Sequence, residues 1–335
     1  MEPYKAKKLP FEFEITNEML DRVASIMEKI GKLGDISNLD KTPYLRKQKK
    51  INSIHSSLAI ENNSLSLNQV TDVINGKVVI GKQKDIQEVK NAYKAYEMIK
   101  EVNPYSLRDL KRVHGCMTFL TVKDSGKFRT GAEGVFDGDK CIFICPQAHM
   151  VSSLMEELFK FIKSNKDKIH PLILSSVFHY EFVFIHPFSD GNGRMARLWQ
   201  NILLYQWRNI FEYLPIESKI YKYQNEYYKA ISECHKNGNS NVFICFMLKM
   251  IEETRDEAIT TSNVALTNEL VNVNKLLDVM EPSIPLTALE IMTRLGIKSK
   301  ETLRNSYLNP AIKLGMINLT SPLKPTSKNQ MYYKS

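Results

Sequence analysis

Apolar side chains recur every three or four residues along most of this chain, which is the spacing of an amphipathic helix. In the segment from residue 17 to 32 they fall at Leu20, Val23, Ile26, Met27 and Ile30. Similar patterns predict helices over residues 45–62, 85–102, 151–163, 171–184, 191–208, 223–233 and 242–260, and another that starts after an N-cap at Ser106. The chain is therefore expected to be mainly α-helical.

One stretch has a different texture. Residues 126–146, GKFRTGAEGVFDGDKCIFICP, are rich in glycine, β-branched and aromatic residues. An Asp-Gly dipeptide at 137–138 lies between two short alternating runs. This pattern predicts a β-hairpin over residues 134–145.

The end of the chain predicts a helix, a glycine turn, and a longer helix from Ser299 to Leu314. Two short strands are expected between Asn318 and Tyr333, so the order resembles a winged helix-turn-helix. Pro310 lies inside the longer helix, which is expected to kink there or to stop just before it.

Length and composition add general limits. The 335 residues are 43% hydrophobic and 25% charged, which is ordinary for a soluble protein with a sizeable core. No apolar run reaches the ~18 residues that span a bilayer, so no membrane partner is expected. The N-terminus lacks the apolar stretch of a signal peptide, and the five cysteines suit no zinc site. Reduced thiols in a cytoplasmic protein are expected.

The net charge of +9 is unevenly placed. Residues 283–335 contain eight Lys or Arg against two Glu, which gives +6 of the total. A basic module makes DNA a partner to consider for residues 283–335. A role in packing or protein binding is the open alternative.

Between two apolar segments the chain carries a polar insert, HPFSDGNGRMAR, at residues 186–197. Gly191, Asn192 and Gly193 begin a predicted helix, where unpaired backbone N–H groups and the helix dipole favour a phosphate. The glycines let the backbone approach the anion, and the amide of Asn192 can donate to a phosphate oxygen.

The remaining polar residues of the insert suit a nucleotide polyphosphate. Asp190 is a hard oxygen ligand for Mg²⁺. Arg194 and Arg197 lie on one side of the helix and offer forked donors to phosphates. His186 is the group of this insert suited to act as a general base near neutral pH. Phe188 is expected to anchor the loop in the core.

The insert matches every fixed position of the signature HxFx(D/E)GNGRxxR, and the chain therefore resembles the Fic (filamentation induced by cAMP) family over roughly residues 85–215. The resemblance implies transfer of AMP from ATP to a serine, threonine or tyrosine hydroxyl of a target protein or of the chain itself. In that scheme His186 is the catalytic base and Asp190 holds Mg²⁺. Gly191, Asn192, Gly193, Arg194 and Arg197 bind the nucleotide. Relatives that act as kinases carry a lysine at the position of Gly193, which argues against that variant.

The predicted hairpin resembles the Fic flap, which docks an extended target segment by strand addition. The residues expected to dock the target are Val135, Phe136, Ile142 and Phe143. A purely structural hairpin is the alternative reading.

A second stretch, SSLAIEN at residues 56–62, resembles the Fic inhibitory motif (S/T)xxxE(G/N). Ser57 and Glu61 are four residues apart and share a helix face. The resemblance implies that Glu61 pairs with Arg197 where the γ-phosphate should bind. Relatives with this glutamate can also remove AMP, so the direction of the reaction stays open.

The expected fold is a Fic helical bundle with a hairpin flap, an N-terminal inhibitory helix region and a C-terminal winged helix-turn-helix. Four regions follow, at residues 1–84, 85–215, 216–264 and 265–335. A de-AMPylating hydrolase and a DNA-binding regulator are the alternative functions, and a homodimer is left open. Among the other histidines, His179 lies on an apolar helix and is expected in the core, while His55, His114, His149, His170 and His235 form no metal spacing.

Overall fold

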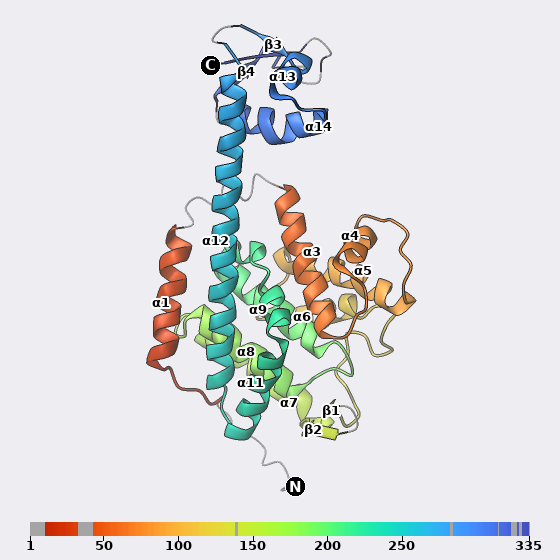
Figure 1. Ribbon diagram of the computed structural model, residues 1–335. Helices are drawn as coiled ribbons and strands as arrows, with labels where there is room; N and C mark the ends of the chain where they lie inside the picture. The colour runs from red at the N-terminus through yellow and green to blue at the C-terminus, as the bar shows by residue number, and fades with distance from the viewer. Residues whose placement is uncertain are drawn as a thin grey trace. The chain divides into compact units, whose positions relative to one another are not determined.

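The computed structural model describes residues 11–32, 43–137, 140–281, 284–313, 315–322, 327 and 330–334. The description covers the backbone alone at residues 29, 31–32, 43–46, 135–137, 140–142, 255–270 and 313. The protein is mainly helical, and it divides into two compact units, residues 1–256 and 257–335 (Figure 1).

The first unit is built from helices and one hairpin. Its elements are α1 (Asn17–Lys32), α3 (Pro43–Ile60), α4 (Leu67–Ile74), α5 (Gln83–Glu97), η1 (Met98–Lys100), α6 (Leu107–Met117), β1 (Gly134–Asp137), β2 (Lys140–Ile144), η2 (Ala148–Met150), α7 (Val151–Asn165), α8 (Pro171–Ile185), α9 (Asn192–Trp207), η3 (Asn209–Tyr213), α10 (Ile216–Lys222) and α11 (Gln224–Asn237). A long helix, α12 (Asn241–Asp278), starts in the first unit and ends in the second.

The helix α8 is the centre of the first unit. It is apolar on nearly every side and almost wholly buried, as a helix without a polar face must be. His170 caps its start and Pro171 occupies its first turn, where a missing N–H costs nothing. α8 packs against α7 and α9, and the largest fully buried side chain, Trp199, comes from α9.

The expected helices are present, with ends that differ by a few residues in most cases. Three helices differ more. α12 runs to Asp278 rather than ending near 260. The short helices α4 and α10 were not expected, although Ser66 and Gln69 form a capping box at the start of α4.

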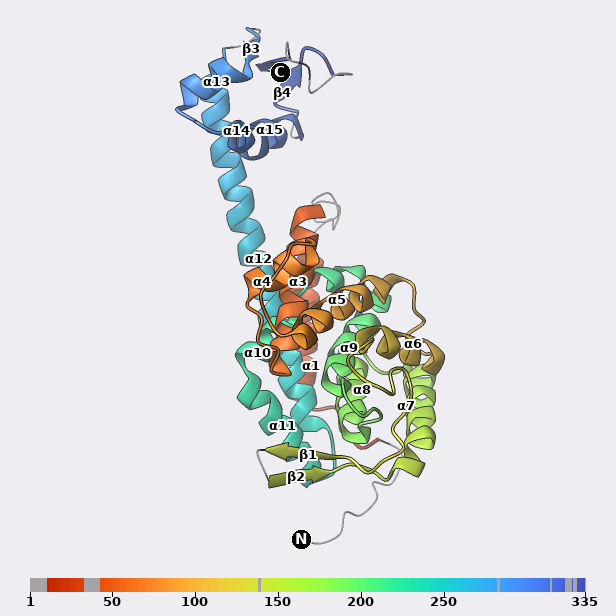
Figure 2. The ribbon, with the colours of Figure 1, turned by 90° about the vertical axis from the view of Figure 1, so that its right-hand side faces the viewer.

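The predicted hairpin is confirmed. β1 and β2 pair antiparallel, with Val135 opposite Phe143. The two strands lie next to α11, as both ribbon views show (Figure 2).

The second unit is a small helical module with a three-stranded sheet. Its elements are β3 (Leu286–Thr287), α13 (Ala288–Leu295), α14 (Lys300–Leu303), η4 (Arg304–Leu308), α15 (Asn309–Lys313), β4 (Ile317–Leu319) and β5 (Met331–Lys334). The strand order is β3-β5-β4, so the two short strands expected after residue 317 are present. Leu276, Ile291, Leu303 and Ile317 lie in one buried cluster that joins these elements.

Pro310 does not stop its helix, contrary to one of the two outcomes expected from the sequence. The preceding turn, η4, widens into a π-helix in which the N–H of Asn309 reaches the carbonyl of Arg304. A wider turn gives room to the proline ring, which would otherwise clash with the carbonyl one turn earlier. Within the part of the chain described, no helix is both long and apolar enough to cross a bilayer.

Candidate active site

His186 ends helix α8 and begins the polar insert. It takes up the left-handed backbone conformation, with φ of 50°, and its N–H still bonds to the carbonyl of Phe182. Its ring atom Nδ1 lies 3.3 Å from the carbonyl oxygen of Val183. A carbonyl only accepts, so Nδ1 carries the proton and the lone pair lies on Nε2. Burial is the main influence and lowers the pKa of His186. The hydrogen bond to Val183 raises this pKa, and the charge of Arg129 lowers it. A lowered pKa favours the neutral ring, whose unprotonated Nε2 can accept a proton.

Asn192 closes the loop that follows. Its side-chain oxygen accepts the N–H of Phe188 at 2.9 Å, and its Nδ2 donates to the carbonyl of the same residue at 2.7 Å. Phe188 is fully buried and stacks on His114 with ring centroids 3.6 Å apart, so it anchors the loop as expected. The Asn192 side chain is thus engaged within the loop, and its role as a phosphate ligand stays a prediction.

The first turn of α9 provides an anion site that a carboxylate already occupies. Gly191 caps the helix with a φ of 81°, a conformation that favours glycine. A Cβ placed on Gly193 would collide with Oε1 of Glu61. The Glu61 carboxylate therefore lies directly on the turn where phosphates are expected to bind.

Arg197 joins that turn to helix α3. Its Nη2 lies 2.7 Å from Oε1 of Glu61 and donates to the carbonyl of Ser57 at 2.9 Å, while its Nε donates to the Ser57 hydroxyl at 3.1 Å. Burial works against the charge of this guanidinium, but Glu61 holds its pKa above the ordinary arginine value. The ion pair expected from the motif is present, and Ser57 and Glu61 share the face that meets it.

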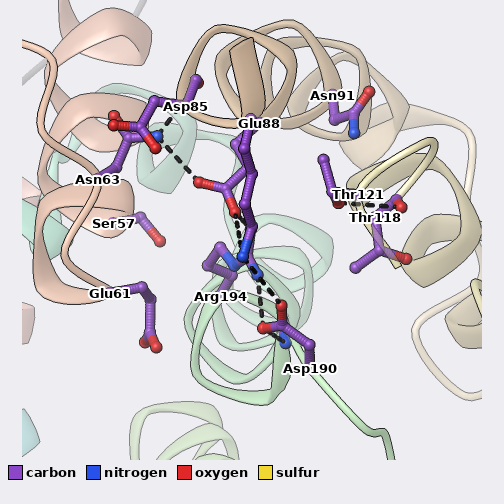
Figure 3. Close-up of polar contacts among 12 residues, drawn as sticks. Ser57, Glu61, Asn63, Asp85, Glu88, Asn91, Thr118, Thr121, Asp190 and Arg194 are labelled. Carbon is purple, nitrogen blue, oxygen red and sulfur yellow. Dashed lines mark hydrogen bonds and ion pairs between the residues drawn. The ribbon is translucent and has the colours of Figure 1, made fainter. Parts of the chain in front are cut away.

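Arg194 lies between two carboxylates (Figure 3). Its Nη2 lies 2.8 Å from Oδ1 of Asp190, and its Nη1 lies 3.2 Å from Oε1 of Glu88 on α5. Arg194 is 3% exposed, whereas the Asp190 side chain is 41% exposed. The Asp190 carboxylate is therefore accessible to solvent and to a dissolved cation, whereas the Arg194 guanidinium is buried between the two carboxylates.

His114 on α6 contacts the loop between α8 and α9, and the sequence did not predict this contact. Its Nδ1 accepts the N–H of Gly126 at 2.9 Å, so its Nε2 carries the proton and donates to the carbonyl of Asp190 at 3.0 Å. Burial lowers the pKa of His114 to about 4, so the ring stays neutral. A single histidine on a helix gives no spacing signal that would have revealed this contact.

Arg129 is a second supporting residue that the sequence did not predict. Its guanidinium donates to the carbonyls of His186 at 2.7 Å and Gly131 at 2.9 Å, and also to that of Pro146. These carbonyls lie at the end of α8 and on both sides of the hairpin. Arg129 therefore fixes the hairpin to the residue expected to act as base.

The hairpin residues expected to dock a target are only partly described. Phe143 stacks on His235 of α11 with centroids 4.0 Å apart and also contacts Phe184. Its half-buried ring packs the hairpin against the helices, and its role in docking a target stays a prediction. The side chains of Val135, Phe136 and Ile142 lie outside the described residues.

Sequence families match two parts of the chain. The Fic/DOC family matches residues 104–204, and the C-terminal domain of "Filamentation induced by cAMP protein Fic-like" matches residues 271–334.

Curated relatives share a name. The "Protein adenylyltransferase Fic" of Nematostella vectensis is 25% identical over 272 residues, which cover 78% of this chain and 60% of the relative. That of Drosophila mojavensis is 27% identical over 253 residues, which cover 71% of this chain and 48% of the relative. The chain thus spans about half to three-fifths of the length of these relatives.

Solved structures show the same fold. A Fic domain protein from Bacteroides thetaiotaomicron matches 74% of this chain and 97% of its own with a TM-score of 0.61, and at 18% identity it shows the fold alone. The crystal structure of a Fic family protein from Desulfovibrio desulfuricans G20 is 36% identical and covers 98% of both chains with a TM-score of 0.73. The chain belongs to the Fic family.

Proposed function

We propose that this protein transfers AMP from ATP to a serine, threonine or tyrosine hydroxyl of a protein, itself included. The target oxygen bonds to the α-phosphorus, the bond from that phosphorus to pyrophosphate breaks, and the hydroxyl proton goes to Nε2 of His186. The observation that carries the proposal is the neutral His186, with Nε2 as its basic atom, one short loop away from the anion-binding turn of α9. The names of the curated relatives support it.

Asp190 fits the divalent cation, expected to be Mg²⁺, that such a reaction uses. Its carboxylate is partly exposed, and no cluster of three or more His, Cys, Asp or Glu that could hold a metal occurs among the described residues. Mg²⁺ commonly binds through one or two carboxylates together with the phosphates of its substrate. The cation would withdraw charge from the phosphates, and the backbone of Gly191–Gly193 and Arg194 would bind their oxygens.

The protein is proposed to be autoinhibited by Glu61. Arg197 is fully buried and serves Ser57 and Glu61, so a γ-phosphate must displace the carboxylate to reach it. ATP bound with Glu61 in place lacks this partner, and its α-phosphate is not held in line for attack.

The test compares incorporation of labelled AMP into the wild-type protein and into Glu61→Gly. The substitution removes the carboxylate from Arg197 and should raise self-modification well above the wild-type level. A double variant, Glu61→Gly with His186→Ala, should lose the gain. Equal labelling of wild type and Glu61→Gly would contradict the proposed inhibition.

Removal of AMP is the second candidate. Oε1 of Glu61 contacts Arg197, and the Glu61 side chain remains 34% exposed beside the first turn of α9. A carboxylate in that position is suited to orient a water molecule toward a bound AMP-protein. Release of AMP from a labelled protein by wild type, and its loss in Glu61→Gly, would support this direction. A cytoplasmic location and a homodimer stay predictions.

A further inference from the structure

Helix α5 contributes a buried carboxylate to the site, and nothing in the signature motif points to it. Glu88 lies 3.2 Å from Nη1 of Arg194, and the two side chains are 9% and 3% exposed. Charged groups this deeply buried are stable only when they are paired, so each of the two fixes the position of the other. Figure 3 shows Arg194 between Glu88 and Asp190.

The two carboxylates that share Arg194 differ in their surroundings. The Asp190 side chain is 41% exposed and can accept a cation from solvent, whereas the Glu88 side chain is 9% exposed and contacts the other end of the guanidinium. A cation on Asp190 competes directly with Nη2 of Arg194, which now lies 2.8 Å from Oδ1. If Asp190 were its sole counter-charge, Arg194 would become an unpaired buried charge each time the cation bound, and that cost would oppose the cation.

Glu88 is itself held in place from two directions. Nδ2 of Asn63 donates to its Oε2 at 2.9 Å and to the carbonyl of Asp85 at 3.1 Å. Lys84 stands 3.9 Å from Oε1 of Glu88 and also 3.9 Å from Oδ2 of Asp190. Glu61 and Asn63 lie two residues apart in one turn. Glu61 contacts Arg197 directly, and Asn63 holds Glu88, which in turn pairs with Arg194.

We propose that Glu88 is a positioning residue that retains Arg194 while Asp190 turns to the divalent cation. It supplies the counter-charge that lets the guanidinium release Asp190 without leaving its place beside the phosphates. The inference rests on the proposed function, because it requires a site that binds ATP with a divalent cation.

The test is a magnesium titration of ATP binding to the 335-residue chain, with displacement of a fluorescent ATP analogue as the readout. Glu88→Gln keeps the shape of the side chain and removes its charge. The Mg²⁺ concentration at half-effect should rise about five- to tenfold, which corresponds to the loss of about 1–1.4 kcal/mol from the ion pair between Glu88 and Arg194. Binding of ATP in the presence of EDTA should not weaken, because no cation then competes for Asp190.

The comparison of ATP binding with Mg²⁺ and with EDTA distinguishes a positioning role from a general loss of structure, because a disordered site would lose ATP affinity under both conditions. Glu97→Gln is the matched control on α5, because Glu97 pairs with Lys50, and its Mg²⁺ dependence should equal that of wild type. An unchanged Mg²⁺ half-effect in Glu88→Gln, or an equal loss of affinity with and without the cation, would overturn the proposal.

Two further variants keep the test decisive. In an Arg194→Ala background, Glu88→Gln should add no further shift in Mg²⁺ dependence, and an additive shift would contradict action through Arg194. Asn63→Ala, at a half-buried turn, should shift the same value about twofold and replaces Glu88→Gln if that variant does not fold. Since every readout is binding, a protein that binds ATP but transfers no AMP would refute the proposed function and leave the role of Glu88 standing.

Discussion

His186 shows how one backbone conformation can prepare a base. The left-handed turn at the end of α8 lets Nδ1 reach the Val183 carbonyl, and this contact assigns the lone pair to Nε2. His186→Ala should lower AMP transfer by Glu61→Gly roughly 10²–10⁴-fold, the usual loss when a general base is removed. ATP binding, measured by displacement of a fluorescent analogue, should stay near normal, because the imidazole is not part of the phosphate-binding turn. A variant that keeps a near-normal transfer rate would refute the role.

The pH dependence of transfer follows from the same residue. Burial, the largest influence, lowers the pKa of His186 below its ordinary value of 6.5. A base is active only when unprotonated, so the acidic limb of the rate should be centred below pH 6.5, and the rate should fall as the pH drops through the lowered pKa. The measurement is kcat/KM of Glu61→Gly against pH. An acidic limb centred above pH 6.5 would show that the imidazole is not held neutral in this way.

At this scale the sequence predicted the residues whose chemistry is visible in a short motif. His186, Asp190, Arg194 and Arg197 fall within twelve positions, and these residue types around a glycine-rich helix start indicate a polyphosphate site. Glu88 and Arg129 act through contacts with segments far away in the chain. No local sequence pattern distinguishes these two residues from charged residues on the surface, because their role depends on which distant residues they contact in the fold.

At the scale of elements, helix α11 holds the end of the inhibitory helix. The carbonyl of Ile60, in the last turn of α3, accepts bonds from Nε2 of Gln224 at 3.2 Å and from the hydroxyl of Tyr228 at 3.3 Å. Helix ends leave such carbonyls without partners within the helix, so these two side chains fix the position of α3 and with it Glu61.

Loss of the Tyr228 hydroxyl should therefore weaken inhibition. Each hydrogen bond contributes about 0.5–1.5 kcal/mol, so Tyr228→Phe should raise self-modification about two- to tenfold, less than Glu61→Gly. Labelled AMP incorporation measures the effect, with Tyr93→Phe on α5 as the control. If Tyr228→Phe and wild type are labelled equally, α11 does not contribute to the lock.

Element by element, periodicity predicted the helices well and their irregularities poorly. α1 has the bounds expected from its apolar positions, because one buried stripe defines a whole helix. The continuation of the chain through Pro310 depends on a π-turn, whose wider geometry leaves no mark in the spacing of apolar residues.

At the scale of the whole molecule, the positive charge is concentrated toward the end of the chain, where residues 283–335 carry +6 of the net charge of +9. Lys298, Lys300 and Arg304 are exposed in and beside helix α14. If this helix contacts duplex DNA, the affinity of the full-length protein should fall as salt rises, because bound phosphates release counterions. Fluorescence anisotropy across a salt series measures the slope, and Lys300→Ala should reduce it. Lack of binding at low salt would refute DNA contact.

Long-range organisation was predictable only through the resemblance. Glu61 and Arg197 are 136 positions apart, and hydrophobic patterning places each on a helix without bringing the helices together. The inhibitory motif predicted that pairing. The contacts of Glu88 on α5 and of Gln224 and Tyr228 on α11 are seen only in the structure.

The fit of Glu61 over Gly193 makes the inhibitory carboxylate behave like a ligand tethered to its own receptor. A bound γ-phosphate and this carboxylate claim the same small space, which exists because residue 193 has no side chain. Competition between a tethered and a free ligand is set by the effective concentration of the tethered one. The proposed inhibition should be graded rather than absolute, because any change that strains or releases the short connection between α3 and α4, which carries Glu61, should change the nucleotide concentration that the protein needs.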